Sequence, residues 1–424
     1  MKESVLHYVW QYRLFAAQLL TTTDGDTVDV IDTGKKNTDA GPDFFNAKIK
    51  IDGTLWAGNV EIHHLSSDWQ RHGHTSDKSY DSVILHVVWK ADVPVYRTDG
   101  SVIPQLELII SQDIEKEYDW LMNNRKWIPC AEKINRVAPV YIRQWKTALL
   151  LERLEYKTRN VKALLFQTGN HWEEVFYVTL ARNFGFGING QPFEQLAKSL
   201  PLSVLAKHKN DLFQIEALLF GQAGLLSGEF TDDYPNLLKK EYLFLKQKYE
   251  LKGLGGSEWK FMRLRPVNFP TIRIAQLASL VHCSSKLFSK IIGNPDVQYL
   301  KTLISAETSE YWETHYTFDK GSPPTDKKTG LNSVNEILIN TVVPVLFAYA
   351  EYSGDEKLKE TALEILEKLP PENNNIISGW QMLDMKVDSA FDSQALIQLK
   401  KNYCDEKKCL CCSIGHKVLT LNKK

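Results

Sequence analysis

The sequence has almost no net charge, because 51 Lys and Arg residues stand against 52 Asp and Glu residues, a formal balance of −1. A chain so balanced does not attract nucleic acid or an acidic membrane through its overall charge, so any such contact needs a local patch. Long apolar runs are scarce as well. The first ten residues, MKESVLHYVW, lack the apolar core of a secretion signal, and the most apolar run, residues 341–350, is too short to span a bilayer. We therefore expect a cytoplasmic protein that makes no membrane contact.

Cysteine is also scarce, with six residues in the chain, and four of them fall within residues 404–412. In a chain without a secretion signal, clustered thiols bind a metal more often than they form disulfides. Cys404, Cys409 and Cys412 are spaced so that they can surround one tetrahedral zinc ion. The fourth ligand is open between Cys130, Cys411 and His416, and reduced thiols without a metal are the alternative.

The apolar pattern changes character near residue 112. Before this point one helix is expected at residues 3–20, and β-rich alternation predicts strands at residues 28–31, 44–51, 55–63, 83–89, 93–96 and 106–110. Beyond it, helical spacing recurs at residues 141–166, 193–205, 212–226, 237–249 and 272–292. We predict an α+β protein with a small α/β domain at residues 1–112 and a large all-α region at residues 113–424.

Acids and histidines crowd the segment between Gly41 and His86. Asp43 begins one predicted strand, and Glu61 lies on its predicted hairpin partner. Two carboxylates on paired strands suit a divalent cation such as Mg²⁺, which polarises a phosphodiester and activates the attacking water. His63 shares a strand face with Glu61 because side chains alternate with a period of two, so it is a candidate to orient or deprotonate that water.

This segment resembles the signature of the PD-(D/E)xK nucleases. That family has Pro-Asp followed by an acid-x-Lys triplet on the next strand, and this chain has Pro42-Asp43 and then Glu61-Ile62-His63. The element order over residues 3–90, a helix, three strands, a helical segment and a strand, is similar too. The resemblance implies that Asp43 and Glu61 ligate Mg²⁺ or Mn²⁺ and that Glu3 on the first helix assists. It departs from the family at His63, which stands where the family has lysine.

Two further likenesses concern the cysteines and the chain as a whole. Some nucleases of that superfamily hold an iron–sulfur cluster on one remote and three clustered cysteines, which implies Cys130 as the partner of Cys404, Cys409 and Cys412. The whole chain also resembles a bacterial family of proteins of unknown function, a likeness that implies no activity.

The hairpin geometry sets a condition on the carboxylate pair. Asp52-Gly53 is a strong two-residue turn, and in a regular ladder it places Asp43 opposite Ile62, so that Glu61 and His63 point away from Asp43. A three-residue turn or a one-residue bulge brings Asp43 opposite His63 or Glu61. The metal-site hypothesis therefore predicts an irregular hairpin; otherwise Asp43 caps a turn and the other two side chains face solvent.

Five of the eleven histidines fall within residues 63–86. The spacing of Asp68, His72 and His74 is compatible with a transition metal. The alternative is that these are polar loop residues, and that His86, which lies among apolar strand residues, belongs to the core.

A basic stretch follows the predicted α/β domain. Residues 125–162 carry ten Lys or Arg residues and three acids, whereas residues 1–110 carry ten basic and fifteen acidic residues. A basic helix beside an acidic metal-holding domain suits a phosphate backbone. The residues expected to contact DNA or RNA are Arg143, Lys146, Arg153 and Lys157. A solvated helix face is the alternative.

The sequence thus favours a nucleic-acid phosphodiesterase that depends on a divalent cation. The first alternative is a nuclease-fold protein that has lost catalysis and binds nucleic acid or acts as a scaffold. The second is a hydrolase of small phosphoesters that uses the histidine cluster.

Overall fold

The computed structural model describes residues 3–15 and 19–421, and the chain divides into two compact units. Unit 1 contains the chain up to Trp145 together with the segment from Lys400, and unit 2 runs from Lys146 to Leu399. The mixed α+β class is confirmed. The division differs from the predicted boundary at residue 112, because the helical segments that follow the sheet and the cysteine-rich segment pack with unit 1.

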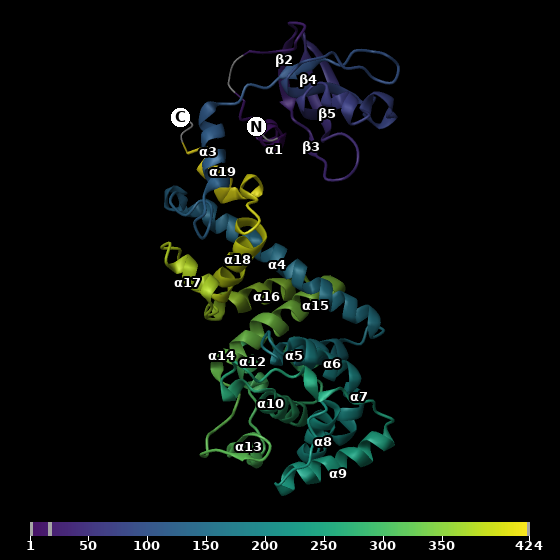
Figure 1. Ribbon diagram of the computed structural model, residues 1–424, viewed down its shortest axis with the longest axis vertical. Coiled ribbons are helices and arrows are strands. Elements are labelled where there is room, and N and C mark those ends of the chain that lie inside the picture. Colours follow the sequence, from purple (N-terminus) through teal and green to yellow (C-terminus); the bar gives the residue numbers. More distant parts are fainter. Residues whose placement is uncertain (1–2, 16–18, 422–424) are drawn as a thin grey trace. The chain divides into compact units, whose positions relative to one another are not determined.

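Unit 1 is built on one mixed sheet (Figure 1). Its strands are β1 (Leu20–Thr21), β2 (Thr27–Asp32), β3 (Lys35–Lys36), β4 (Phe44–Ile51), β5 (Thr54–Leu65), β6 (Val83–Lys90) and β7 (Gln105–Glu107). Their order is β1-β2-β4-β5-β6-β7, with β3 paired to β4. Pairing is antiparallel from β1 to β5, whereas β6 and β7 run parallel to β5. The predicted strand at residues 93–96 is reduced to a single bridge between Tyr96 and Val102.

The predicted hairpin irregularity is present in the β4–β5 hairpin. Ile51 pairs with Thr54 across the two-residue turn, so the turn itself is regular. The register then shifts between Phe44 and Ala47, where three steps along β4 match two steps along β5. Asn46 adopts a φ of 57°, a left-handed conformation that Asn tolerates better than most residues. The irregularity is therefore a one-residue β-bulge.

The first helix is shorter than predicted. α1 spans Glu3–Gln11, whereas the pattern suggested residues 3–20, of which Ala17 lies outside the described residues. Arg13 has a φ of 50°, its amide donates to Trp10, and the amide of Leu14 donates to Val9. This is a Schellman termination, in which a left-handed residue caps the last carbonyls of a helix.

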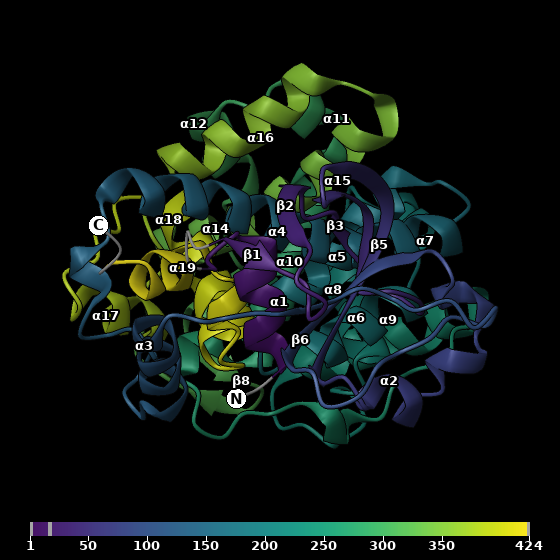
Figure 2. The same cartoon turned by 90° about the horizontal axis from the view of Figure 1, so that it is seen from above.

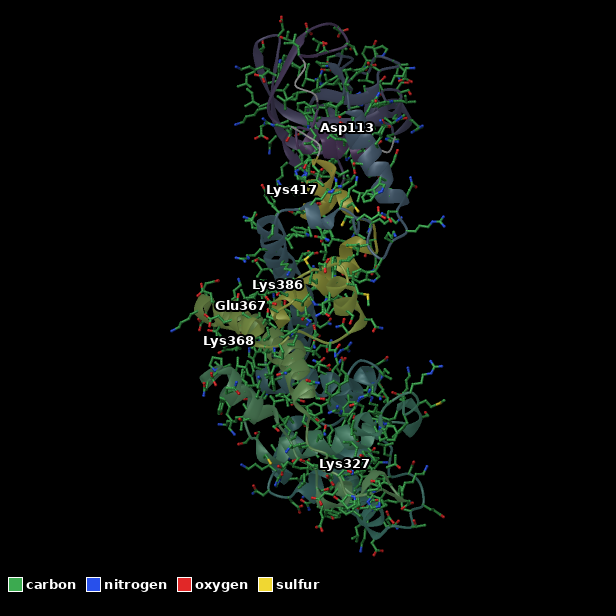
Figure 3. The ribbon with its side chains drawn as sticks, turned by 90° about the vertical axis from the view of Figure 1, so that its left-hand side faces the viewer. Asp113, Lys327, Glu367, Lys368, Lys386 and Lys417 are labelled. Atoms are coloured by element: carbon green, nitrogen blue, oxygen red, sulfur yellow. The ribbon has the colours of Figure 1, made fainter. Side chains whose placement is uncertain are left out.

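The remaining helical segments of unit 1 lie between β5 and β6 and after β7 in the sequence. They are α2 (Asp68–Arg71), η1 (His74–Ser76), η2 (Lys78–Tyr80), α3 (Gln112–Asn123), η3 (Ile134–Arg136), the start of α4 (Pro139–Gln167), η8 (Lys400–Cys404), η9 (Cys409–Cys411) and α19 (Ser413–Leu419). Figure 2 shows α19 beside α1, where the Tyr8 hydroxyl lies 2.8 Å from His416 Nδ1. Lys417, labelled in Figure 3, places its Nζ 3.7 Å from the centre of the Tyr141 ring.

Unit 2 is helical apart from one short hairpin. Its main helices are the rest of α4, α5 (Trp172–Phe184), α6 (Gly190–Ser199), α7 (Leu202–Leu205), α8 (Leu212–Gln222), α9 (Asp233–Lys248), α10 (Pro270–Cys283), α11 (Leu287–Gly293), α12 (Val297–Ile304), α13 (Glu310–Glu313), α14 (Leu331–Ile337), α15 (Val343–Ser353), α16 (Glu356–Lys368), α17 (Asn375–Gln381) and α18 (Ala390–Leu399). Shorter elements are η4 (Ala206–His208), η5 (Gly256–Glu258), η6 (Pro266–Asn268), η7 (Leu338–Val342), β8 (His315–Thr317) and β9 (Lys320–Gly321).

One helical run of unit 2 is long and apolar enough to cross a membrane by length and composition. It is Leu331–Ser353, formed by α14, η7 and α15, and it is longer than the apolar run recognised in the sequence. In the structure 78% of its most apolar 18-residue stretch is buried, as in the core helix of a helical domain.

Candidate metal centre

The bulge in β4 brings Asp43 and Glu61 together. Phe44 pairs with Val60, so Asp43 lies opposite Glu61. The Asp43 amide donates to Glu61 Oε2 at 3.0 Å, and the Ile62 amide donates to Asp43 Oδ2 at 2.9 Å. The two carboxylates are therefore neighbours, with Glu61 held by the Asp43 amide and Asp43 held by the Ile62 amide. This is the arrangement that the metal-site hypothesis requires.

Helix α1 adds two side chains to this pair. His7 Nε2 lies 3.3 Å from Asp43 Oδ2 and 3.8 Å from Glu3 Oε1. Glu3 was expected here, but His7 was not singled out from the sequence. Its spacing of four residues from Glu3 places the two on one helix face, and that was the available signal.

Four imidazoles form a cluster beside Glu61, and two of them contact its carboxylate. His63 and His74 each place Nε2 3.4 Å from Glu61 Oε1, and His72 Nδ1 lies 3.2 Å from His63 Nε2. His86, which pairs with Glu61 across the parallel β5–β6 ladder, places Nε2 2.8 Å from His63 Nδ1. His63, His74 and His86 are buried, whereas His72 is exposed.

Burial shifts the ionisation of this cluster. It raises the pKa of the Glu61 carboxyl, and the facing His74 opposes that rise. Burial and the neighbouring imidazoles lower the pKa of His63 to about 2, and burial lowers the pKa of His86 to about 3. For His7, burial would lower the pKa, but contact with Asp43 outweighs it and the pKa is raised. Neutral imidazoles therefore face the carboxylates from β5 and β6.

Asp68 does not join the imidazoles as its spacing suggested. Its Oδ2 accepts the amide of Leu65, and its Oδ1 lies 2.7 Å from Arg71. The donor atoms that lie within 4.8 Å of one another belong to His63, His72 and His74 instead. The sequence pattern failed here because a carboxylate at the start of a short helix closes its own turn, whereas His63 reaches the site from a strand.

Three of the four basic residues expected to contact nucleic acid have partners within unit 2. Lys146 is buried and places Nζ 2.9 Å from Asp392 Oδ1. Arg153 Nε and Lys157 Nζ both donate to Gln394 Oε1, each at 2.6 Å. The three side chains therefore bind partners on other helices of unit 2, which is explained by the packing of α4 inside the unit. Arg143 belongs to unit 1 and is exposed.

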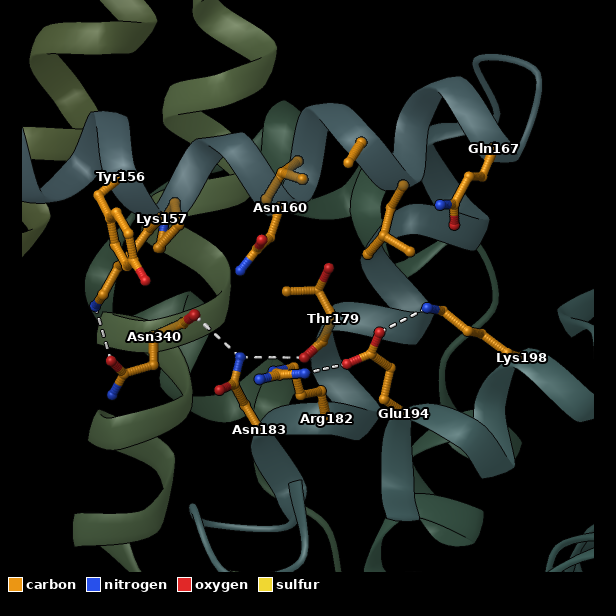
Figure 4. A pocket seen from close by; sticks show the side chains of 14 residues that line it. Tyr156, Lys157, Asn160, Gln167, Thr179, Arg182, Asn183, Glu194, Lys198 and Asn340 are labelled. Carbon is orange, nitrogen blue, oxygen red and sulfur yellow. Dashed lines mark hydrogen bonds and ion pairs between the residues drawn. The ribbon is translucent and has the colours of Figure 1, made fainter. Parts of the chain in front are cut away.

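Lys157 borders a cavity of about 440 Å³ in unit 2 (Figure 4). Its Nζ donates to Asn340 Oδ1 at 2.8 Å, and across the cavity Arg182 and Lys198 both bind Glu194. Burial, together with the nearby Arg153, lowers the pKa of Lys157 to about 7. A lysine that is partly neutral at physiological pH is a weak phosphate ligand, so the cavity does not strengthen the expected nucleic-acid contact.

The cysteine-rich segment lies in unit 1 with Cys130. Cys130, Cys409 and Cys412 are buried and Cys404 is half-buried, whereas Cys411 is exposed. Burial raises the pKa of Cys404, and the nearby thiols of the other three raise it further. Of the residues considered for a fourth ligand, Cys130 lies close enough to Cys404 to raise its pKa, and His416 Nδ1 lies 2.8 Å from the Tyr8 hydroxyl. Zinc or an iron–sulfur cluster at these thiols stays a prediction.

Sequence comparison gives the chain a family. The family model described as "Protein of unknown function (DUF2851)" matches residues 3–375. The chain belongs to DUF2851. The match spans every residue of the Asp43–Glu61 site and ends before Cys404, and it confirms the predicted membership of a family of unknown function. No curated protein and no solved structure matches this DUF2851 chain, so its chemistry must be argued from the site.

Proposed function

We propose that this chain hydrolyses phosphodiester bonds of nucleic acid with a divalent cation held by Asp43 and Glu61. The observation that carries the proposal is the β4 bulge, which turns two acids from paired strands toward each other beside a histidine cluster. A bulge next to a cluster of ionisable side chains is a common device for aiming a functional side chain. Shifted pKa values in the same place, raised for Glu61 and lowered to about 2 for His63, point the same way.

The donor set fits the proposed cation. Mg²⁺ and Mn²⁺ prefer carboxylate oxygens with water and phosphate oxygens in the remaining positions. Bound there, the cation would polarise the phosphodiester and lower the pKa of the attacking water. The chain itself would hold the site rigid, since backbone amides fix both carboxylates and His7 Nε2 abuts Asp43 Oδ2 at 3.3 Å. We therefore assign His7 as a positioning residue and Glu3 as its neighbour.

His63 does not supply the positive charge that lysine supplies in the PD-(D/E)xK nucleases. It is buried, and its ring contacts other imidazoles, so a proton there is strongly disfavoured. Its Nε2 lies 3.4 Å from Glu61 Oε1 and 3.2 Å from His72 Nδ1. The positive charge that lysine supplies elsewhere would have to come from the cation.

The test is cleavage of labelled single- and double-stranded DNA and RNA by the full-length protein with Mg²⁺ or Mn²⁺. Asp43→Asn and Glu61→Gln should each lower the rate by roughly 100-fold, since even residues that only orient metal ligands cost up to that much. His64→Gln is the matched control, because His64 follows His63 on β5 and alternation directs its side chain to the other face.

The alternatives appear as outcomes of this assay. Equal residual cleavage in all variants identifies a contaminant and overturns the proposal. No cleavage of any nucleic acid, with retained binding, supports a scaffold that has lost catalysis. Turnover of p-nitrophenyl phosphate without cleavage of nucleic acid supports a hydrolase of small phosphoesters.

A further inference from the structure

We propose that His63, His72, His74 and Glu61 form a binding site for a transition metal, with Zn²⁺ as the ion that fits it best. This site is distinct from the Mg²⁺ or Mn²⁺ site proposed above, although Glu61 borders both. It requires no nuclease activity, so it stands or falls separately from the proposed function.

Three of the six distances among the four donor atoms match the edges of a tetrahedral metal site. Ligands about 2.1 Å from a central ion lie about 3.4 Å from one another. His63 Nε2 is 3.2 Å from His72 Nδ1, and Glu61 Oε1 is 3.4 Å from both His63 Nε2 and His74 Nε2. The three imidazole donors all lie within 4.8 Å of one another. Contacts of 3.4 Å are long for hydrogen bonds, but they match the edges of a zinc tetrahedron.

The surroundings hold the His63 and His74 rings in orientations suited to ligation. A histidine that binds metal through one nitrogen usually hydrogen-bonds a second partner through the other. His63 does so, because its Nδ1 lies 2.8 Å from His86 Nε2. Tyr80 stacks on the His74 ring at 3.7 Å, and Trp69 packs edge-on against both His63 and His74. Rings clamped in this way lose little entropy when an ion binds.

The chemistry of the donors selects the class of metal. Imidazole nitrogen suits Zn²⁺, Cu²⁺, Fe²⁺ and Ni²⁺, whereas Mg²⁺ demands oxygen ligands. Three nitrogens and one carboxylate oxygen therefore favour Zn²⁺ over Mg²⁺. His72 is exposed while the other three ligands are buried, so the site opens to solvent on one side.

The test is Zn²⁺ binding to full-length protein that has been stripped with chelator, followed by calorimetry and elemental analysis. His72→Ala and His74→Gln should each bind one equivalent of Zn²⁺ fewer than the wild type, or bind that equivalent roughly 10- to 100-fold more weakly. His64→Ala should match the wild type. His72→Ala is the decisive variant because its exposed side chain contributes little to folding, and thermal unfolding of each variant checks this.

Co²⁺ substitution separates this site from the cysteines. Co²⁺ at the imidazole site gives ligand-field absorption without the sulfur-to-cobalt charge-transfer band of a thiolate site, and His72→Ala should remove only the former. Equal Zn²⁺ stoichiometry and affinity in His72→Ala, His74→Gln and His64→Ala overturns the proposal. Zn²⁺ binding that depends on His72 in a protein that cleaves no nucleic acid leaves this site standing and removes only the proposed function.

Discussion

At several buried side chains of this protein, burial shifts the pKa more than neighbouring charges do. Glu216 on α8 is the clearest case outside the candidate metal centre. Its side chain is fully buried, Tyr234 donates a hydrogen bond to Oε2, and the Ser309 hydroxyl lies 3.0 Å from Oε1. Burial raises the pKa of Glu216 from 4.5 to about 7, although the hydroxyl donors oppose the rise. The carboxyl is therefore protonated in the folded chain under conditions in which it ionises in the unfolded chain.

This shift predicts how stability depends on pH. Between pH 4.5 and about 7 the folded state holds a proton at Glu216 that the unfolded state has released, so the free energy of unfolding falls as pH rises through that window. The loss amounts to about 3 kcal/mol at most. Glu216→Gln should remove this dependence. Between pH 4.5 and about 7 the free energy of unfolding of the variant should therefore rise relative to that of the wild type by up to about 3 kcal/mol.

The measurement is urea unfolding of wild type and Glu216→Gln at several pH values, followed by a probe in unit 2. Glu258→Gln, which changes an exposed carboxyl of the same unit, serves as the control and should follow the wild type. Parallel pH profiles for wild type and Glu216→Gln would show that Glu216 is ionised in the folded chain.

At the scale of elements, the β4 bulge is the feature on which the candidate site depends. Asn46 holds a φ of 57°, and its amide donates to Asn59 Oδ1 at 3.1 Å. Without the bulge, the register of the Asp52-Gly53 turn would place Asp43 opposite Ile62 and separate it from Glu61.

Two substitutions at Asn46 test this dependence. Asn46→Gly keeps the left-handed conformation accessible and should be nearly neutral. Asn46→Val disfavours it by roughly 1–2 kcal/mol and should lower both stability and Mn²⁺-dependent cleavage. Equal stability and cleavage in the two variants would show that the bulge does not hold the acids together.

The hairpin also shows which parts of the structure could be predicted from the sequence. Alternation and the Asp-Gly turn predict the hairpin, and a bulge is needed because a regular ladder would place Asp43 and Glu61 on opposite faces. Its position at Asn46 did not follow, since nothing local forces one residue rather than its neighbour out of the ladder.

The imidazole cluster was only partly accessible for a similar reason. His86 reaches His63 through parallel pairing of β5 with β6, a contact between distant residues that no local pattern specifies. His7 was missed because helical spacing shows which residues share a face, but not that this face contacts Asp43. Asp68 was overvalued because sequence spacing does not show that its carboxylate closes its own turn.

At the scale of the whole molecule, unit 1 is discontinuous, and the cysteine-rich segment is what closes it. Cys404, Cys409 and Cys412 come from the returning segment, whereas Cys130 precedes unit 2 in the chain. Gly415 allows this segment to fold tightly, because a Cβ at that position would lie 2.1 Å from the carbonyl oxygen of Cys409.

A metal at these thiols would fasten the returning segment to the rest of unit 1. Cys404→Ser and Cys412→Ser should each lose about one equivalent of zinc or iron relative to Cys411→Ser, since one four-ligand site holds one ion. Hydrogen exchange should then rise in α3 and α19 and stay unchanged in α8 and α10. The absence of zinc and iron from these thiols in freshly purified wild type would contradict the prediction.

The division of unit 1 also has a consequence for how the protein is made. A ribosome synthesises Lys146–Leu399 after the sheet and before α19, and at roughly 5–20 residues per second this takes roughly 10 to 50 s. Unit 2 has its whole sequence during that interval, while the sheet carrying Asp43, Glu61 and the imidazoles still awaits its closing helix. A chain released before residue 413 would contain every strand of the sheet but would lack α19, whose His416 contacts Tyr8 on α1, the helix that carries Glu3 and His7.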